Sequence, residues 1–131
     1  MITYRASDSK FRERHSKKSG EPLSFSASLT EGLSNPGYEI YLERLPSGRR
    51  ASAPHWHTDT DETLYVLSGR VKAHEGSQWI ELQTGDTLHF QKDSKNYHFV
   101  ENPFEEEAQF LIVKPKTENT DVVYPSLNIS Q

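Results

Sequence analysis

The sequence predicts an all-β fold, a sandwich or barrel of short strands with the jelly roll among its candidates. Short runs of apolar or alternating residues recur along the chain, and turn residues such as Ser68-Gly69 and Thr84-Gly85 separate them at intervals of roughly 8–12 residues. No stretch has the periodicity of an amphipathic helix. The 131 residues fit a single domain that is large enough to bury a core.

Seven segments are predicted to be strands. The first, 38–45, places Ile40 and Leu42 on one face and is followed by a Pro-Ser-Gly turn. The others follow in order at 62–67, 70–75, 78–82, 87–90, 97–100 and 108–113. Each lies between turn signals and is too short for a typical helix, so a strand is the simplest interpretation.

The two ends of the chain differ from this region. Residues 1–20 have no periodicity, and we expect them to form a basic, flexible N-terminal arm. Nucleic acid or a partner could alternatively be bound by the basic residues of the arm, which are Arg5, Lys10, Arg12, Arg14, Lys17 and Lys18. Residues 21–131 are expected to form the barrel domain, with a core at about 36–114. The C-terminal tail, 115–131, is a candidate for an edge strand or for a crossing to a neighbouring subunit.

The composition disfavours several classes of function. A net charge of −4 gives no sign of a nucleic-acid partner or of an anionic membrane surface. The chain has no cysteine, so only nitrogen and oxygen ligands are available for a metal ion. No apolar run approaches the roughly 18 residues of a membrane span, and the N-terminus lacks the apolar core of a secretory signal. We therefore predict a cytoplasmic protein without nucleic-acid or membrane partners.

The stretch PHWHTDTDETLYVLSG, residues 54–69, carries a candidate metal site. Residues two apart on a strand point to the same face, so His55 and His57 are expected to project side by side. The polar TDTD run can form a turn that returns Glu62 to the same place. Leu64 shares the face of Glu62, which predicts an interior face where a metal ion offsets the cost of burying a carboxylate.

A third histidine is needed to complete a nitrogen-rich site. The candidates are His74, His89 and His98. His98 is favoured because it alternates with Val100 and follows the polar loop QKDSKN, whereas the other two fit surface or strand-edge positions.

The spacing of these residues resembles that of the cupin family. The pattern G-x6-H-x-H-x4-E-x6-G, from Gly48 to Gly69, is similar to the first cupin motif, with one extra residue between the first glycine and the first histidine. The segment 85–102 is similar to the second motif: it begins with Gly-Asp and ends with His98 and Asn102. In this segment Gln and Asp stand at the family's proline and glycine positions, and two extra residues precede the histidine.

The resemblance covers about residues 36–114 and implies the double-stranded β-helix of a small, single-domain cupin of the quercetin dioxygenase type. It implies a homodimer as well. It also implies a mononuclear metal site with the ligands His55, His57, Glu62 and His98. Three imidazoles and one carboxylate suit Fe(II), Mn(II), Ni(II) or Co(II), and zinc is compatible with them.

Two open positions on a six-coordinate ion favour a metal-dependent oxygenase that acts on a small enolisable or hydroxylated organic substrate. In this interpretation Glu62 is both a ligand and the catalytic base that takes a substrate proton. A non-redox isomerase or lyase is the alternative, because the same ion can polarise a carbonyl group. A cupin that binds a small molecule without turnover is the third candidate.

Overall fold

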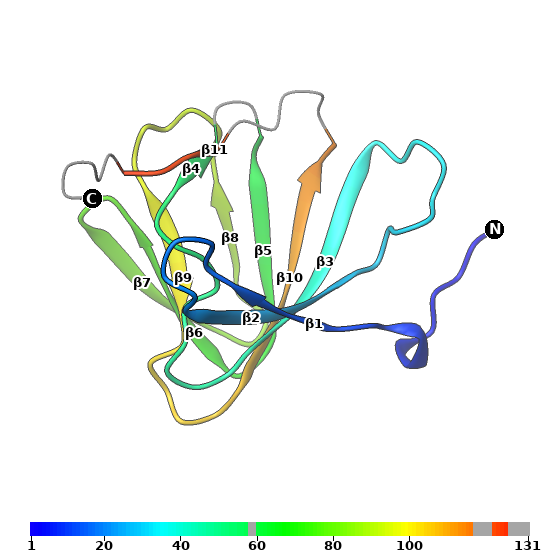
Figure 1. The fold of residues 1–131 in the computed structure, drawn as a ribbon, viewed down its shortest axis with the longest axis horizontal. Helices are drawn as coiled ribbons and strands as arrows, with labels where there is room; N and C mark the ends of the chain where they lie inside the picture. Colours follow the sequence, from blue (N-terminus) through cyan, green and yellow to red (C-terminus); the bar gives the residue numbers. More distant parts are fainter. Residues whose placement is uncertain (58–59, 117–121, 126–131) are drawn as a thin grey trace.

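The strands form three sheets that make up a barrel (Figure 1). The computed structural model describes residues 1–57, 60–116 and 122–125. The largest sheet has the order β1 (Arg12–His15), β2 (Pro22–Ser28), β3 (Tyr38–Leu45), β10 (Ala108–Pro115), β5 (Glu62–Ser68) and β8 (Thr87–Phe90). A second sheet has the order β7 (Gln78–Gln83), β6 (Arg70–Glu75) and β9 (His98–Glu101), and a third pairs β11 (Val122–Val123) with β4 (Trp56–His57).

The hydrophobic core lies between the two larger sheets. Its buried members from the six-stranded sheet are Leu45, Leu64, Val66, Phe90, Ala108 and Phe110, and those from the three-stranded sheet are Val71, Ala73, Leu82 and Val100. Residues from both sheets therefore pack into one cluster, as in a jelly roll. The only helical element among the described residues is a short 3-10 turn at Ala6–Asp8, and no described helix is long and apolar enough to cross a membrane.

The structure confirms the predicted all-β class and contains all seven predicted strands. β3, β6 and β8 have the predicted bounds, and the other four differ by one or two residues at an end. The tail adds β11, which agrees with the edge-strand candidate, while 117–121 and 126–131 lie outside the described residues. The predicted polar turn at 58–61 also lies partly outside them.

Two strands precede the first predicted one. Residues 12–15 are not part of a flexible arm, contrary to the prediction: they form β1 and pair with β2, with Arg12 opposite Ser26. β1 (Arg-Glu-Arg-His) has no apolar alternation, whereas Leu23, Phe25 and Ala27 of β2 alternate with serines, a strand signal not used in the prediction. The division of the chain at residue 20 stays a prediction.

The inner face of the large sheet is apolar on one half and polar on the other. On β5 and β10, Val66 and Phe110 are fully buried. Phe110 pairs with Glu43 of β3, and Glu43 pairs with Ser26 of β2. Directly paired residues lie on the same face of a sheet, so this row runs from apolar to polar across the barrel.

Candidate metal centre

Four side chains with metal-binding atoms meet between β4, β5 and β9. His55 immediately precedes β4, and His57 ends it. Glu62 and His98 begin β5 and β9. One nitrogen or carboxylate oxygen of each residue lies within 4.8 Å of those of the others. The structure thus brings together all four residues that the sequence analysis selected.

Backbone pairing and ring packing fix two of the imidazoles. His55 and His98 face each other in an isolated antiparallel bridge, in which each N–H donates to the other's carbonyl at 3.0 and 2.7 Å. Their ring centroids are 4.6 Å apart. His98 also stacks on Phe90, with ring centroids 3.9 Å apart and planes 6° from parallel. These contacts limit the movement of both rings before any ligand binds.

Glu62 lies between two of the histidines. Its Oε1 atom is 3.3 Å from Nε2 of His57 and 3.3 Å from Nε2 of His98. Burial alone would raise the pKa of Glu62, but the contacts with these two imidazoles and their charges outweigh burial and hold the pKa well below its usual range. The carboxyl group is therefore ionised at neutral pH, which is the form that binds a metal ion.

The tautomer of His55 follows from its hydrogen bond. Its Nδ1 atom is 2.8 Å from the carbonyl oxygen of Ala53. A carbonyl can only accept, so Nδ1 carries the hydrogen and Nε2 keeps a free lone pair. Burial lowers the pKa of His55 to about 4, although the bond to Ala53 acts in the opposite direction. The ring is therefore neutral at neutral pH.

The cluster fits a single divalent transition-metal ion. Nε2 of His57 is buried and forms no hydrogen bond within the described part of the chain, despite its proximity to Glu62. An unsatisfied buried polar atom costs about 1–3 kcal/mol, which a bound ion would remove. Donors that lie about 2.1 Å from one ion are at most about 4.2 Å apart, so the observed spread needs only a small inward movement.

The other candidate histidines lie outside the cluster. His74 forms an ion-pair contact with Glu101 and stacks on Phe99, with ring centroids 4.3 Å apart. His89 is exposed, and its Nδ1 lies 2.9 Å from the hydroxyl of Thr63. His89 lies at the predicted kind of position, on the edge strand β8, whereas His74 is half-buried on the central strand β6. Both have structural contacts of their own.

A cavity of about 380 Å³ opens onto the cluster. Its apolar wall is formed by Phe90, Val100, Phe110 and Ile112. Its polar lining includes Arg14, Ser26, Tyr41, Glu43 and Lys114. None of these polar residues was predicted to line a site with the histidines, and Arg14 was predicted only as part of the basic arm. The alternation of β3 could have indicated two of them, because Tyr41 and Glu43 share one face while Ile40 and Leu42 occupy the other.

Glu43 is a second buried carboxyl group in this cavity, and it is not part of the metal cluster. Ser24 donates a hydrogen bond to it at 2.7 Å, and Ser26 donates another. The Arg14 guanidinium lies 3.8 Å away. Burial raises the pKa of Glu43 despite these contacts, and the charge of Glu62 adds to the increase.

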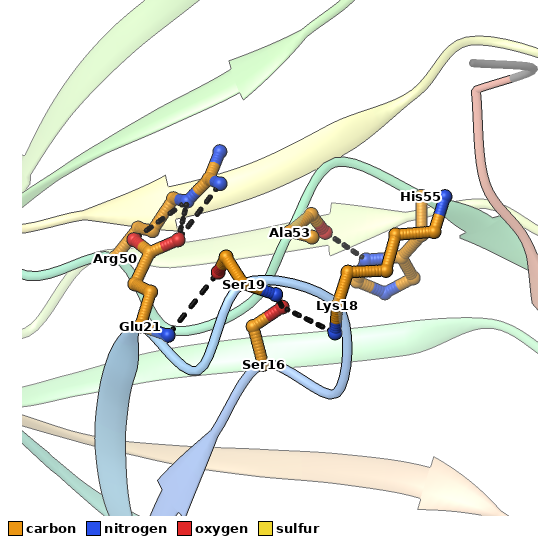
Figure 2. Close-up of polar contacts among 7 residues, drawn as sticks. All are labelled: Ser16, Lys18, Ser19, Glu21, Arg50, Ala53 and His55. Carbon is orange, nitrogen blue, oxygen red and sulfur yellow. Dashed lines mark hydrogen bonds and ion pairs between the residues drawn. The ribbon is translucent and has the colours of Figure 1, made fainter. Parts of the chain in front are cut away.

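Hydrogen bonds join the hairpin of β1 and β2 to residues 50 and 51, which precede His55 in the chain. Figure 2 shows Glu21 and Arg50 joined by paired hydrogen bonds, and the His55 ring bonded to Ala53. The Arg50 bonds are 2.9–3.2 Å long. Arg14 of the same hairpin donates to the carbonyl of Ala51 at 2.8 Å. The N-terminal hairpin thus supports the segment that carries the first histidine of the cluster.

The C-terminal segment lies beside the same histidines. β11 pairs with β4, with Val122 opposite His57. The ring of Tyr124 is 5.9 Å from that of His55, and both Val122 and Tyr124 line the cavity. Part of the predicted tail therefore borders the cavity.

A jelly-roll barrel with three histidines and a glutamate gathered inside it defines a class of small proteins with nitrogen- and oxygen-ligated metal sites. The sequence matches the model of the family described as "Cupin domain" over residues 41–114. The chain therefore belongs to the cupin domain family. The resemblance found in the sequence motifs is confirmed.

Solved structures show the same fold. A protein from Acidithiobacillus ferrooxidans, whose name as a sugar phosphate isomerase is provisional, has a TM-score of 0.80 and 19% identity, with 95% of this chain and 81% of that chain covered. A sugar phosphate isomerase of the cupin superfamily from Silicibacter pomeroyi has a TM-score of 0.73 and 24% identity, with 79% and 66% covered. A predicted oxalate decarboxylase from Thermotoga maritima has a TM-score of 0.73 and 23% identity, with 88% and 100% covered. No curated protein matches the sequence.

Proposed function

We propose that the protein is a metal-dependent enzyme that moves a proton on a small hydroxylated carbonyl compound, as an isomerase or lyase does. One observation carries the proposal: the cavity beside the metal cluster contains a separate buried carboxyl group, Glu43. His55, His57, Glu62 and His98 would hold the ion. When bound, a divalent ion would polarise an oxygen atom of the substrate.

Glu43 is better suited than Glu62 to act as the base. A general base works best when its pKa lies near the working pH. The pKa of Glu43 is raised by burial, whereas that of Glu62 is held low by two imidazoles. In the proposed step the Glu43 carboxylate takes the proton from the hydroxyl-bearing carbon next to the carbonyl group and returns it to the former carbonyl carbon, while the hydroxyl proton moves to the former carbonyl oxygen. The step is balanced without an external oxidant or reductant.

The neighbouring residues support this role. Ser24 and Ser26 hold the carboxyl group in place by donating to it, and Arg14 lies close enough to stabilise its ionised form. The names of the structural relatives from Acidithiobacillus and Silicibacter are those of isomerases, and the Thermotoga name is that of a decarboxylase. Their identities are all below 25%, so they support the reaction type only as an analogy.

The metal-dependent oxygenase is the second candidate. The apolar wall formed by Phe90, Val100, Phe110 and Ile112 favours it, because this wall suits an aromatic or aliphatic substrate. In that case the catalytic base is expected to be Glu62, as the sequence analysis predicted.

Proton exchange and oxygen uptake separate the two functions. Metal-reconstituted protein would be incubated in D₂O with small aldoses, ketoses and hydroxy acids, and exchange of carbon-bound hydrogen would be followed by NMR. We expect exchange without oxygen consumption in the wild type and a loss of about 100-fold or more in Glu43→Gln. Glu81→Gln, a surface change outside the cavity, is the matched control. Oxygen uptake that persists in Glu43→Gln, without any exchange, would support the oxygenase instead.

A further inference from the structure

A second hollow continues from the metal cavity along the polar half of the sheet. We define this groove by Lys10, Arg12, Arg14, Ser28, Thr30 and Lys116, which line it together with their neighbours. Arg14, Ser26 and Tyr41 line both the groove and the metal cavity. The two hollows therefore share a boundary, and one elongated molecule can occupy both.

The alternation of β1 and its approach accounts for the charge of the groove. Lys10, Arg12 and Arg14 are two residues apart, so an extended chain directs all three to the same side. Arg12 pairs with Ser26, and Arg14 donates to Ser24, which places this side against the inner row of β2. All three side chains are exposed, so the positive stripe borders the open groove and is available to a ligand from solvent.

Several of these cations have spare hydrogen-bonding capacity. Lys10, Arg12 and Lys116 form no ion pair within residues 1–57, 60–116 and 122–125. The acidic residues in the groove are Glu31 and Glu39, and Glu39 accepts a hydrogen bond from Tyr41 at 2.9 Å. The hydroxyl groups of Ser28 and Thr30 lie in the same lining and add neutral donors.

We propose that the groove binds the phosphate group of a phosphorylated substrate whose reacting end lies at the metal cluster. Lys10, Arg12 and Lys116, the groove cations without an ion pair in the described chain, come from two separate segments. Together with the hydroxyl groups of the same lining, they match a dianion that has three acceptor oxygens. A carboxylate, with one charge and two oxygens, would leave part of this set unused. The assignment of the reacting end rests on the proposed function, whereas binding of phosphate in the groove does not depend on turnover.

Inorganic phosphate is the probe that tests the site. It would be titrated into the isotope-labelled full chain at constant ionic strength, with chloride as the reference anion, and amide shifts would be followed by NMR. We expect saturable shifts centred on Arg12, Ser28 and Lys116. Arg12→Gln/Lys116→Gln should bind phosphate about tenfold more weakly or worse, since it removes two charged donors. Lys17→Gln/Lys18→Gln removes the same charge from the turn after β1, outside the groove, and should bind as the wild type does.

Two further arms can overturn the proposal. Shifts that centre on His57 and His98, and not on Arg12, would move the anion to the metal cluster. Acetate at equal ionic strength should bind at least about tenfold more weakly than phosphate, and equal binding would reassign the groove to carboxylates. An equal loss of phosphate affinity in Lys17→Gln/Lys18→Gln would mean that the protein's net charge, and not the groove, attracts the anion. A failed proton-exchange assay beside a normal phosphate titration would reject the proposed function alone.

Discussion

At the scale of single residues, two buried glutamates in one cavity have opposite properties. Glu62 lies 3.3 Å from two imidazole nitrogens, and its pKa is low. Glu43 lies among hydroxyl groups at the polar edge of the core, and its pKa is raised. At Glu62 the two imidazoles favour the ionised form, whereas at Glu43 burial outweighs the hydroxyl groups and Arg14 and favours the protonated form. Under the proposed function, this difference assigns metal binding to Glu62 and proton transfer to Glu43.

The raised pKa of Glu43 predicts a pH dependence of stability. The folded protein holds this proton to a higher pH than the unfolded chain does, so the stabilisation is fully present below the ordinary value of 4.5 and is lost as pH rises through the folded pKa. Glu43→Gln cannot lose a proton. Its free energy of unfolding, relative to the wild type, should therefore increase as pH rises from about 4.5 toward neutral.

Urea denaturation at a series of pH values measures this difference. Glu81→Gln, which removes an exposed carboxylate from an ion pair with Arg70, is the control and should show little pH-dependent difference from the wild type. If the free energy of unfolding of Glu43→Gln, relative to the wild type, stays constant or falls as pH rises, a raised pKa of Glu43 is contradicted.

Sequence analysis at this scale found the four clustered residues but not the remainder of the cavity. The spacing of His55, His57 and Glu62 within a short stretch indicated a shared site, because strand parity and one turn suffice to bring them together. Glu43 and Arg14 are carried on β3 and β1, and only the pairing of β1, β2 and β3 brings them near each other. Nothing in one sequence specifies that pairing.

At the scale of elements, tight glycine turns set the register of the strands around the cluster. Gly69 and Gly85 have φ values of +76° and +93°, a region in which a side chain is unfavourable. A Cβ atom at Gly69 would lie 2.8 Å from the carbonyl oxygen of Glu107, whereas a Cβ at Gly85 would meet open space. Gly69 is therefore required both by its conformation and by the backbone beside it.

This difference predicts unequal costs for the same substitution. Gly85→Ala should lower the free energy of unfolding by about 1–2 kcal/mol through its backbone conformation alone. Gly69→Ala should lower the free energy of unfolding by a similar amount and by about 1–3 kcal/mol more, because the main chain at residues 107 and 108 must move. Chemical denaturation of both variants measures the gap. Equal losses would mean that the close approach at Gly69 does not constrain the fold.

The alternation of β3 suggests that its Ile40 and Leu42 face points into the barrel, but the opposite face is the inner one. Ile40 and Leu42 lie on the outer face of the sheet, while Glu43 is buried inside. Apolar alternation identified the strand itself, because the period of two is independent of which face is buried. It could not identify the inner face, since that depends on the cavity that the strand borders.

At the scale of the whole molecule, regular strand spacing and the two cupin motifs were enough to predict the barrel, and both the fold and the family are confirmed. The hairpin of β1 and β2 was not predicted: β1 has no apolar alternation, and the alternation of Leu23, Phe25 and Ala27 with serines on β2 was not used. The inward positions of the hairpin are arginines and serines. These polar positions border the cavity and the groove, so the strands that sequence patterning missed are those that line the candidate binding surfaces.

The outer face of the large sheet leads us to expect the homodimer that the family resemblance implies. Leu111 of β10 pairs with Leu42 on one side and with Tyr65 on the other, which makes an apolar row across three strands. Sedimentation should show a dimer that Tyr65→Lys shifts to monomer, because a buried charge at such a face is unfavourable. Trp79→Lys, at an exposed position on the other sheet, is the control. A wild type that is monomeric at all concentrations would contradict this expectation.

The central claim is that His55, His57, Glu62 and His98 hold one divalent metal ion, and metal content tests it most directly. Untagged wild-type protein, His57→Ala and His74→Ala would each be reconstituted, desalted and measured by mass spectrometry. We predict about one equivalent of iron, manganese, nickel, cobalt or zinc in the wild type and in His74→Ala, and a large loss in His57→Ala. Absence of metal from the wild type after reconstitution, or equal loss in both variants, would contradict the assignment.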